Sequence, residues 1–412
     1  MNRKPSMLVI FLTVFIDLIG FGIVVPLVPM FSRNFGASAW LIGVIIASYS
    51  AMQFIFSPIW GKLSDRHGRR PILLISTAGA AISYVIFAFA SLHGNLWLLL
   101  ASRLFAGACG GNITVAQAYV ADISKPEERS KKLGLIGMAF GLGFIFGPAI
   151  SGVMLHFFGP TAPGWSAATL CALNFLLTFF ILAESLKPDS TLAGNRPRFA
   201  QWGHTLSQPK IGLLIFLFFI ATFAFSCFEC TLPLLITDNF HLLNLGDSTA
   251  PATTVIWLFV FCGLISALVQ GGAIGRLVTK FGEPKLIAAS LVITGISLIL
   301  LPLIHGDGAL KWSAIFHLAD TPWLAMLGAL VLLSFGSSLS RAPLFGLLSN
   351  LTPANEQGAT IGVAQSAGSL ARIVGPLFAG TLYGQSPLLP YVICGGIAIL
   401  AGFFAVQKLT AK

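Results

Sequence analysis

The chain reads GKLSDRHGRRP at residues 61–71, between two long apolar runs. Within these eleven residues lie two glycines and five charged side chains: Gly61, Lys62, Asp65, Arg66, Gly68, Arg69 and Arg70. Charged groups are disfavoured in hydrocarbon, so the stretch has to stay at the membrane surface while its flanking helices cross. Glycine permits sharp bends because it has no Cβ, and clustered Lys and Arg mark the cytoplasmic side. The stretch therefore predicts a short cytoplasmic turn that acts as a hinge or gate.

The composition excludes a water-soluble globular protein. Of the 412 residues, 56% are hydrophobic and only 9% are charged, which is typical of a chain that lives in a bilayer. The net charge of +10 does not indicate a nucleic-acid partner, because the cations lie in short loops rather than on one face. The six cysteines lie inside apolar runs, where a thiol acts as a small hydrophobic group, so we expect no disulfide framework.

Twelve apolar stretches are long enough to cross a bilayer, which takes about 20 helical residues. They are residues 7–31, 40–60, 72–92, 96–121, 133–157, 165–184, 211–236, 253–272, 286–304, 322–346, 358–384 and 389–408. A polar segment with two prolines separates the sixth stretch from the seventh. We therefore predict an all-α membrane protein with 12 transmembrane helices. Its parts are an N-terminal six-helix bundle (1–184), a cytoplasmic linker (185–210) and a C-terminal six-helix bundle (211–412).

The distribution of cations predicts the orientation. If both termini and the turns after even-numbered helices are cytoplasmic, 19 of the 24 Lys and Arg residues lie in the cytoplasm. Only Arg33 and Lys311 fall on the opposite side, while Arg103, Arg341 and Arg372 lie within apolar stretches. Because short loops rich in Lys and Arg stay on the cytoplasmic side, this bias predicts that both termini are cytoplasmic.

Two internal repeats predict that the six-helix bundles are related by pseudo-symmetry. GRLVTKFGEPK at 275–285 repeats the charged turn 214 residues later, with Thr279 in the place of Asp65. GPAISG at 147–152 recurs as GPLFAG at 375–380, 228 residues later. Duplicated halves are common in membrane transporters, and the lost carboxylate predicts that the two gates differ in strength.

A glycine-rich element interrupts the fifth apolar stretch, at Gly143, Gly147, Pro148 and Gly152. Each glycine inside a helix costs about 1 kcal/mol relative to alanine, so the element needs a structural or functional reason. Its spacing leaves a groove on one face of the helix, which predicts that a second helix backbone packs closely there.

Away from the ends of the apolar stretches lie five charged side chains: Asp17, Arg103, Glu229, Arg341 and Arg372. An ionised carboxylate in mid-membrane costs about 2.5–3.5 kcal/mol on the mildest scale, so it has to be protonated, paired or in contact with water. Asp17 and Arg103 have similar estimated depths, and we expect them to pair. Glu229 has Arg372 or Arg341 as its partner. We predict that Asp17, and also Glu229, carry a proton that is exchanged for a substrate, although a static buried ion pair is the alternative.

Amide side chains within the apolar stretches are candidates for substrate binding: Gln53, Asn112, Gln117 and Gln365. Such groups often serve instead as hydrogen-bond partners between helices. The seven histidines are scattered without metal-ligand spacing, so we expect no metal, no cofactor and no enzymatic site.

The charged turn resembles the loop signature of the major facilitator superfamily, G-x-L-x-D-R-x-G-R-R, and matches every specified position. In that family the Asp and Arg residues form a charge relay that latches one face of a transporter. The resemblance implies that Asp122, in YVADIS, is the partner of Arg69 in this latch, with a solvated loop charge as the alternative. Arg103 is similar to the arginine of the family's L-x-x-x-R-x-x-Q-G motif, in which Ala106 replaces the glutamine.

Residues 49–152 resemble the tetracycline/proton antiporters of this superfamily, and the glycine-rich element resembles the antiporter motif G-x-x-x-G-P-x-x-G-G, with Ser151 in place of a glycine. Three positions that carry ionisable groups in those antiporters are Ser83, Ser266 and Thr294 here. These departures favour a small amphipathic substrate, a drug or a tetracycline-like compound, over tetracycline itself.

The resemblance implies a proton-coupled exporter of small amphipathic compounds in the bacterial inner membrane, working by alternating access. The substrate, protons and membrane lipid are the expected partners, and we expect a monomer. A proton-coupled exporter or symporter of a specific metabolite, siderophore or lipid is the alternative within the same class. A membrane enzyme and a non-transporting receptor are alternatives from other classes.

Overall fold

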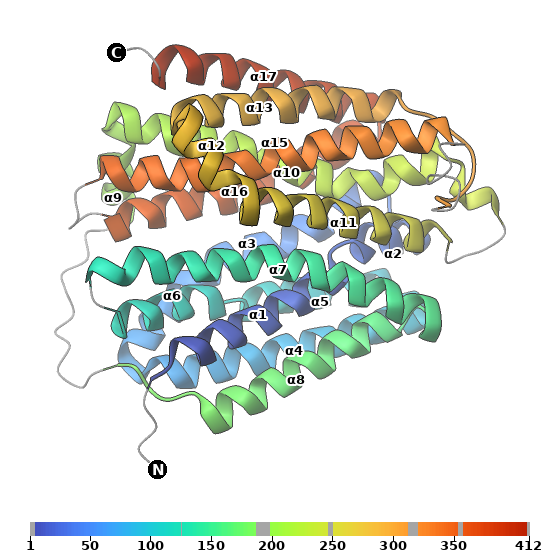
Figure 1. Ribbon diagram of the computed structural model, residues 1–412. Helices are drawn as coiled ribbons and strands as arrows, with labels where there is room; N and C mark the ends of the chain where they lie inside the picture. The colour runs from blue at the N-terminus through green and yellow to red at the C-terminus, as the bar shows by residue number, and fades with distance from the viewer. Residues whose placement is uncertain are drawn as a thin grey trace. The chain divides into compact units, whose positions relative to one another are not determined.

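The computed structural model describes residues 5–124, 126–186, 198–245, 250–311, 320–352 and 357–409. All regular elements in these ranges are helices, so the predicted all-α class is confirmed. Figure 1 shows the helices coloured along the chain. The first eight are α1 (Met7–Val24), α2 (Leu27–Asn34), α3 (Ala39–His67), α4 (Arg69–His93), α5 (Leu96–Cys109), α6 (Asn112–Asp122), α7 (Pro126–Phe158) and α8 (Ala162–Ile181).

The second half of the chain is built in the same way. Its α-helices are α9 (Arg198–Ser207), α10 (Pro209–Asn239), α11 (Ala250–Leu268), α12 (Ile274–Phe281), α13 (Glu283–Leu300), α15 (Thr321–Leu351), α16 (Gln357–Tyr383) and α17 (Leu388–Leu409). Two short 3₁₀ helices, Leu242–Leu245 and Leu301–Leu303, and one π-helical segment, Val269–Ala273, complete the described elements.

Eleven helical segments of the described chain are long and apolar enough to cross a membrane. They match eleven of the twelve predicted spans, with α1 and α2 joined as Met7–Asn34 and α5 and α6 joined as Leu96–Asp122. The predicted span at 358–384 is α16, a helix of 27 residues that is not among the eleven. Gln365 and Arg372 lie in this helix and lower its mean hydropathy. The described helices are therefore consistent with twelve spans.

Packing divides the chain into two compact units. The first unit comprises Met1–Ala37 and Ser48–Gly194, and the second unit comprises Ser38–Ala47 and Asn195–Lys412. The start of α3 thus groups with the second unit and its remainder with the first. The predicted linker, 185–210, includes α9, but residues 187–197 lie outside the described part of the chain. The functional division at 184 and 211 stays a prediction.

The predicted turn at 61–71 is much shorter than expected. α3 continues as a helix to His67, and α4 begins at Arg69. Only Gly68, with φ +96°, has the positive backbone angle that favours glycine. The prediction that Gly61 bends the chain is wrong, because Gly61 lies inside α3, where its carbonyl accepts a hydrogen bond from Ser64 Oγ at 2.8 Å.

The repeated turn in the second unit has the same backbone geometry. α12 ends at Phe281 and α13 begins at Glu283, so Gly282 alone separates the two helices, with φ +77°. Thr279, in the place of Asp65, donates its hydroxyl hydrogen bond to the carbonyl of Arg276 within its own helix at 2.9 Å. The repeat therefore keeps the glycine turn, but a hydroxyl whose hydrogen bond lies within its own helix replaces the charged carboxylate.

The glycine-rich element forms the predicted groove, and α1 packs into it along α7 (Figure 1). A Cβ at Gly147 would lie 2.5 Å from Gly22 Cα, and a Cβ at Gly143 would lie 2.8 Å from Leu18 Cβ. Pro148 and Gly152 are buried in the same helix. Because the α1 backbone occupies the space of the missing side chains, the close helix approach predicted from the glycines is confirmed at Gly143 and Gly147.

In the second unit, α10 packs along α16 at the repeated GPLFAG element. A Cβ at Gly375 would lie 3.1 Å from Ser226 Cβ and 3.2 Å from the carbonyl oxygen of Phe223. This approach is tight but less so than at Gly147. In each half of the chain, the first helix therefore packs against a glycine of the fifth helix: α1 against Gly147 of α7, and α10 against Gly375 of α16.

We predict that Gly147→Val destabilises the protein by about 1–3 kcal/mol, because the added side chain has to displace the α1 backbone. Thermal unfolding of the purified protein in detergent measures this loss. Gly328→Val is the matched control, because Gly328 lies inside α15 with no heavy atom within 4 Å of its Cβ position. Equal melting temperatures for the two variants would contradict the packing argument.

Candidate functional site

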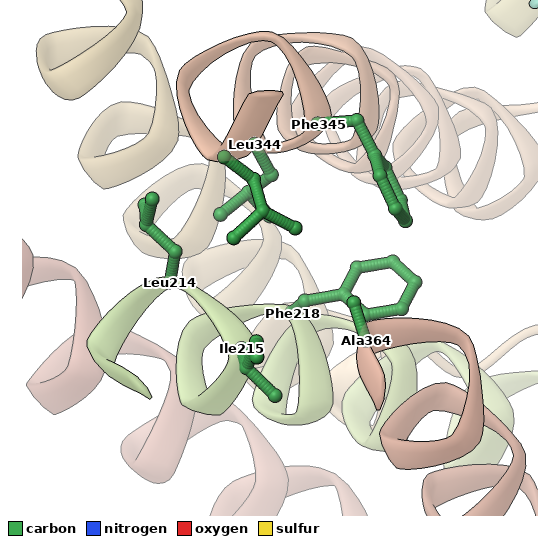
Figure 2. Close-up of a pocket in the computed structure, with 7 residues that line it drawn as sticks. Leu214, Ile215, Phe218, Leu344, Phe345 and Ala364 are labelled. Carbon is green, nitrogen blue, oxygen red and sulfur yellow. The ribbon is translucent and has the colours of Figure 1, made fainter. Parts of the chain in front are cut away.

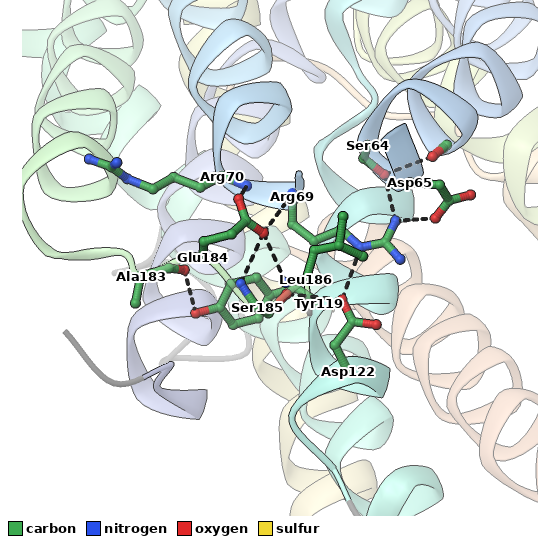
Figure 3. A network of polar contacts seen from close by, with 11 residues as sticks. Ser64, Asp65, Arg69, Arg70, Tyr119, Asp122, Ala183, Glu184, Ser185 and Leu186 are labelled. Carbon is green, nitrogen blue, oxygen red and sulfur yellow. Dashed lines mark hydrogen bonds and ion pairs between the residues drawn. The ribbon is translucent and has the colours of Figure 1, made fainter. Parts of the chain in front are cut away.

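A network of polar contacts surrounds Arg69 at the start of α4 (Figure 3). Arg69 is only 7% exposed. Its Nη1 donates to Ser64 Oγ at 2.7 Å and to Asp65 Oδ1 at 2.5 Å, while its Nε donates to Asp122 Oδ2 at 3.0 Å. The predicted contact between Asp122 and Arg69 is therefore present, and Asp65 is a second carboxylate on the same guanidinium, while the role of these charges as a latch stays a prediction. We call these residues, with Gly68, Glu184 and Ser185, the Gly68 network.

Glu184 is the member of this network that sequence reasoning missed. Its Oε1 accepts hydrogen bonds from the backbone N–H groups of Arg69 at 2.8 Å, Ser185 at 2.9 Å and Leu186 at 3.0 Å. Its Oε2 accepts from the Arg70 N–H at 3.0 Å. The first N–H groups of a helix have no partner within the helix, and a carboxylate there also interacts favourably with the helix dipole. Glu184 therefore caps α4 from the end of α8.

The same contact explains Gly68. A Cβ at this position would lie 2.5 Å from Glu184 Oε2, and the φ of +96° would strain any other residue. The sequence contained a signal for this arrangement. A glycine directly before a helix has no side chain that can cap the helix, so the first N–H groups of that helix have no local acceptor. The acceptor, Glu184, could not be identified from the sequence because it lies 115 residues further along the chain.

Further contacts fasten the end of α8 to the network. Ser185 Oγ donates to Asp122 Oδ2 at 2.9 Å, and the Tyr119 hydroxyl donates to the carbonyl of Ala183 at 2.9 Å. Arg70 Nη2 donates to the carbonyl of Phe179 at 2.6 Å. Arg66, in the last turn of α3, has an exposed side chain. The segment that leads into the predicted linker is thus held by the same carboxylate that pairs with Arg69.

Asp17, on α1, lies beside a small polar recess in the first unit. Its Oδ2 accepts a hydrogen bond from Asn112 Nδ2. Its Oδ1 is buried and has no hydrogen-bond partner among the described residues. The recess has room for about one water molecule and is lined by Asp17, Tyr49, Ser76, Ala80, Ser83, Tyr84, Ala106, Cys109, Gly110 and Asn112. A carboxylate oxygen without a partner, next to a polar recess, is suited to accept a proton.

The expected ion pair between Asp17 and Arg103 is absent from the described contacts, so that prediction is wrong. Arg103 is 3% exposed, and its guanidinium lies over the rings of Tyr84 at 5.8 Å and Phe87 at 5.6 Å from their centroids. Its Nε and Nη2 have no hydrogen-bond partner among the described residues. Similar depth along two helices does not determine the direction of the side chains, and here Asp17 is held by Asn112.

Glu229 and Arg372 lie on two helices of the second unit that pack against each other, α10 and α16. Glu229 Oε1 is buried and has no hydrogen-bond partner among the described residues. Arg372 is the cation whose charge acts on Glu229, and its Nη2 donates to Ser369 Oγ at 3.2 Å. Arg341, on α15, is close enough to Arg372 for the two charges to repel each other. Of the two arginines predicted as partners, Arg372 is the one whose charge acts on Glu229.

A small apolar gap lies between α10, α15 and α16 in the second unit (Figure 2). It is lined by Leu214, Ile215, Phe218, Leu344, Phe345, Leu348 and Ala364. The rings of Phe218 and Phe345 meet edge to face, with centroids 5.0 Å apart. With no polar group in its lining, the gap is a packing feature of the helix core rather than a proton or ion site.

The four amides predicted to bind substrate divide into two pairs. Asn112 is held on Asp17, and Gln53 Nε2 donates to the carbonyl of Gly110 at 3.3 Å, so both are engaged inside the first unit. Gln117 and Gln365 are partly exposed. A substrate role for any of the four stays a prediction. The Asn112 amide contacts the Asp17 carboxylate and is buried rather than exposed.

These observations define a multi-pass membrane protein with ionisable groups buried inside its spans, which is typical of a transporter. The family model described as "Major Facilitator Superfamily" matches residues 10–318 and 242–410. The chain belongs to the major facilitator superfamily, and it is a transporter rather than an enzyme.

Its relatives include tetracycline resistance proteins, so the predicted resemblance is confirmed. The class C protein of Escherichia coli is 31% identical over 94% of this chain and 91% of that protein. Major facilitator superfamily domain-containing protein 10 of Homo sapiens is 27% identical over 98% and 92% of the two chains.

Solved structures show the same fold. The human organic anion transporter MFSD10 (TETRAN) is similar with a TM-score of 0.67 and 25% identity, over 97% of this chain and 98% of that chain. The nucleoside transporter NupG is similar with a TM-score of 0.72 over 100% of both chains, at 12% identity. At this identity the second likeness concerns the fold alone.

We predict that Glu184→Ala destabilises the protein by about 0.5–2 kcal/mol, the usual cost of losing a helix cap. Thermal unfolding of the purified protein measures the effect. Glu283→Ala is the control, because Glu283 is the acidic residue beside the equivalent glycine turn in the second unit. A melting temperature for Glu184→Ala that equals that of the unchanged protein would contradict the capping role.

Proposed function

We propose that this transporter exports small amphipathic compounds, drugs or tetracycline-like molecules, in exchange for protons. The observation that carries the proposal is Asp17: a carboxylate on the first span with one buried oxygen that lacks a partner among the described residues, beside a polar recess. The similarity to tetracycline resistance proteins supports the class of substrate. We place the protein in a bacterial inner membrane, as a monomer with both termini in the cytoplasm.

The coupling follows from the chemistry of a buried carboxyl group. A low-dielectric environment favours its protonated form, whereas a hydrogen-bond donor or a water-filled pathway favours its ionised form. Alternating access exposes the same group first to one side of the membrane and then to the other. If substrate binds only to the ionised form, release of the proton on one side permits loading of the substrate there. Exchange then results without a covalent step.

Glu229 is proposed to make a second contribution. It resembles Asp17 in having a buried oxygen without a partner among the described residues, but Arg372 is its charged neighbour. Asp17 is the primary proton carrier in this proposal, because its buried oxygen without a partner among the described residues lies beside the polar recess, whereas Glu229 has a charged neighbour.

A second candidate is export of organic anions. The interiors of the apolar spans contain three arginines, Arg103, Arg341 and Arg372, but only two carboxylates, Asp17 and Glu229. A negatively charged substrate would balance the excess cation, and the similar human protein MFSD10 is described as an organic anion transporter. Uptake of fluorescent cationic and anionic compounds into everted vesicles distinguishes the two candidates by which charge class accumulates.

We predict that Asp17→Asn abolishes proton-coupled transport while the protein stays folded, because the amide cannot exchange a proton. In everted vesicles with a preset pH gradient, addition of substrate should collapse the gradient with the unchanged protein and leave it intact with the variant. Substrate counterflow without a gradient, which requires binding and conformational change only, should persist.

Asp307→Asn serves as the control, because the Asp307 side chain is 92% exposed and lies outside the membrane spans. It removes one carboxylate without removing the proposed proton carrier, so its gradient collapse should match that of the unchanged protein. Undiminished proton coupling in Asp17→Asn would rule out Asp17 as the carrier.

A further inference from the structure

The fourth span is interrupted next to Asp17. α5 ends at Cys109 and α6 begins at Asn112, with Gly110 and Gly111 between them. At the interruption, the Gly110 N–H bonds to the carbonyl of Gly107 at 3.1 Å, and the Gly111 N–H bonds to the carbonyl of Cys109 at 2.8 Å. These tight turns replace the regular helical bonds, so neighbouring carbonyls lose their usual partners. In a membrane such carbonyls need other donors.

Three side chains from adjacent helices supply those donors. Trp60 Nε1 donates to the carbonyl of Ala108 at 2.6 Å, and Gln53 Nε2 donates to the carbonyl of Gly110 at 3.3 Å. Ser76 Oγ donates to the carbonyl of Cys109. Consecutive carbonyls 108, 109 and 110 are thus satisfied from α3 and α4. The interruption is a built feature of the first unit rather than a frayed helix end.

The glycine at the start of α6 is required by this packing. A Cβ at Gly111 would lie 2.5 Å from Trp60 Cγ. The indole that donates to Ala108 therefore fills the space of the missing side chain. Trp60 both satisfies a carbonyl and closes the interruption sterically.

Asn112, the first residue of α6, connects the interruption to Asp17. Its side chain is buried, and the residue is 3% exposed. Its Oδ1 accepts from the Ile113 N–H at 2.8 Å, which sets the orientation of the amide, and its Nδ2 donates to Asp17 Oδ2. The interruption therefore places an amide donor at the carboxylate.

We infer that Asn112 is the positioning residue for the coupling carboxylate, and that the interruption at 110–111 exists to place it there. The inference rests on the proposed function, because it assumes that Asp17 carries the proton. Asn112 stabilises the ionised form of Asp17 by donating to it, so the proton leaves when the recess meets water. It thereby sets the pH range in which exchange runs, without itself carrying a proton.

Other groups near Asp17 do not provide an equivalent donor. The ionisable side chains that face or neighbour it are Tyr49, Tyr84, Arg103, Cys109 and Cys171. Arg103 lies over the Tyr84 ring and makes no ion pair with Asp17 among the described contacts. The Asn112 amide is the donor that the structure places on the Asp17 carboxylate.

The test measures exchange by Asn112→Leu in everted vesicles across a range of pH. Leucine has a similar size but donates no hydrogen bond, so Asp17 should keep its proton to higher pH. We expect the pH of half-maximal exchange to rise by about one to two units, the range expected for a lost hydrogen bond to a charged group. Trp60→Phe, which removes only one carbonyl donor of the interruption, should move the profile in the same direction by less.

Asn174→Leu is the matched control, because Asn174 is also a buried amide that donates to α1, to the Thr13 carbonyl at 2.8 Å, but not to Asp17. It should lower the melting temperature without moving the pH profile. If Asn112→Leu does not fold, Asn112→Asp retains the shape and removes the donor when ionised, and it should move the profile in the same direction. An unmoved profile in a folded Asn112 variant, or an equal shift in Asn174→Leu, would overturn the inference.

The same vesicles separate this inference from the proposed function. If Asp17→Asn retains proton coupling, the proposed function fails and Asn112 has no carboxylate to position. If Asp17→Asn loses coupling while Asn112→Leu keeps the pH profile of the unchanged protein, only the positioning role fails.

Discussion

Buried polar groups have to find hydrogen-bond partners inside the protein, and this constraint organises the first unit at two places. Around Gly68, the Arg69 guanidinium and the N–H groups of α4 receive oxygens from α3, α6 and the end of α8. At the interruption of the fourth span, three carbonyls receive donors from α3 and α4. Both places join segments distant in the chain, so each depends on the positions of several helices at once. That dependence is what a coupling element requires.

The two copies of the glycine turn have the same backbone conformation but different side-chain contacts. Gly68 and Gly282 form the same turn, with positive φ in both units. In the first unit the turn supports a relay of charges, whereas Thr279 in the second closes its hydrogen bond within its own helix. The backbone therefore tolerates both versions, because the glycine rather than the carboxylate determines the turn. The asymmetry between the two units lies in the side chains.

In the first unit, the buried groups Asp17 and Arg103 do not pair with each other among the described contacts. A static ion pair between Asp17 and Arg103 would have stabilised both groups and left neither available. Instead, the Arg103 guanidinium lies over aromatic rings, and Asp17 accepts a hydrogen bond from the neutral Asn112 amide. Cation–π contacts and single hydrogen bonds are weaker than a buried ion pair and easier to exchange.

Much of this protein could be predicted from local sequence. Span lengths, the cation bias and the repeats can be recognised without knowing which helices are neighbours. The same holds for the glycine spacing at Gly143 and Gly147 and for the turn motif around Arg69. The extent of the turn, the Glu184 cap and the placement of Asn112 on Asp17 depend on which helix faces lie opposite each other. Hydropathy gives the depth of a side chain but not its direction around the helix axis. Only the tertiary structure decides that direction, because it results from the packing of all neighbouring helices together.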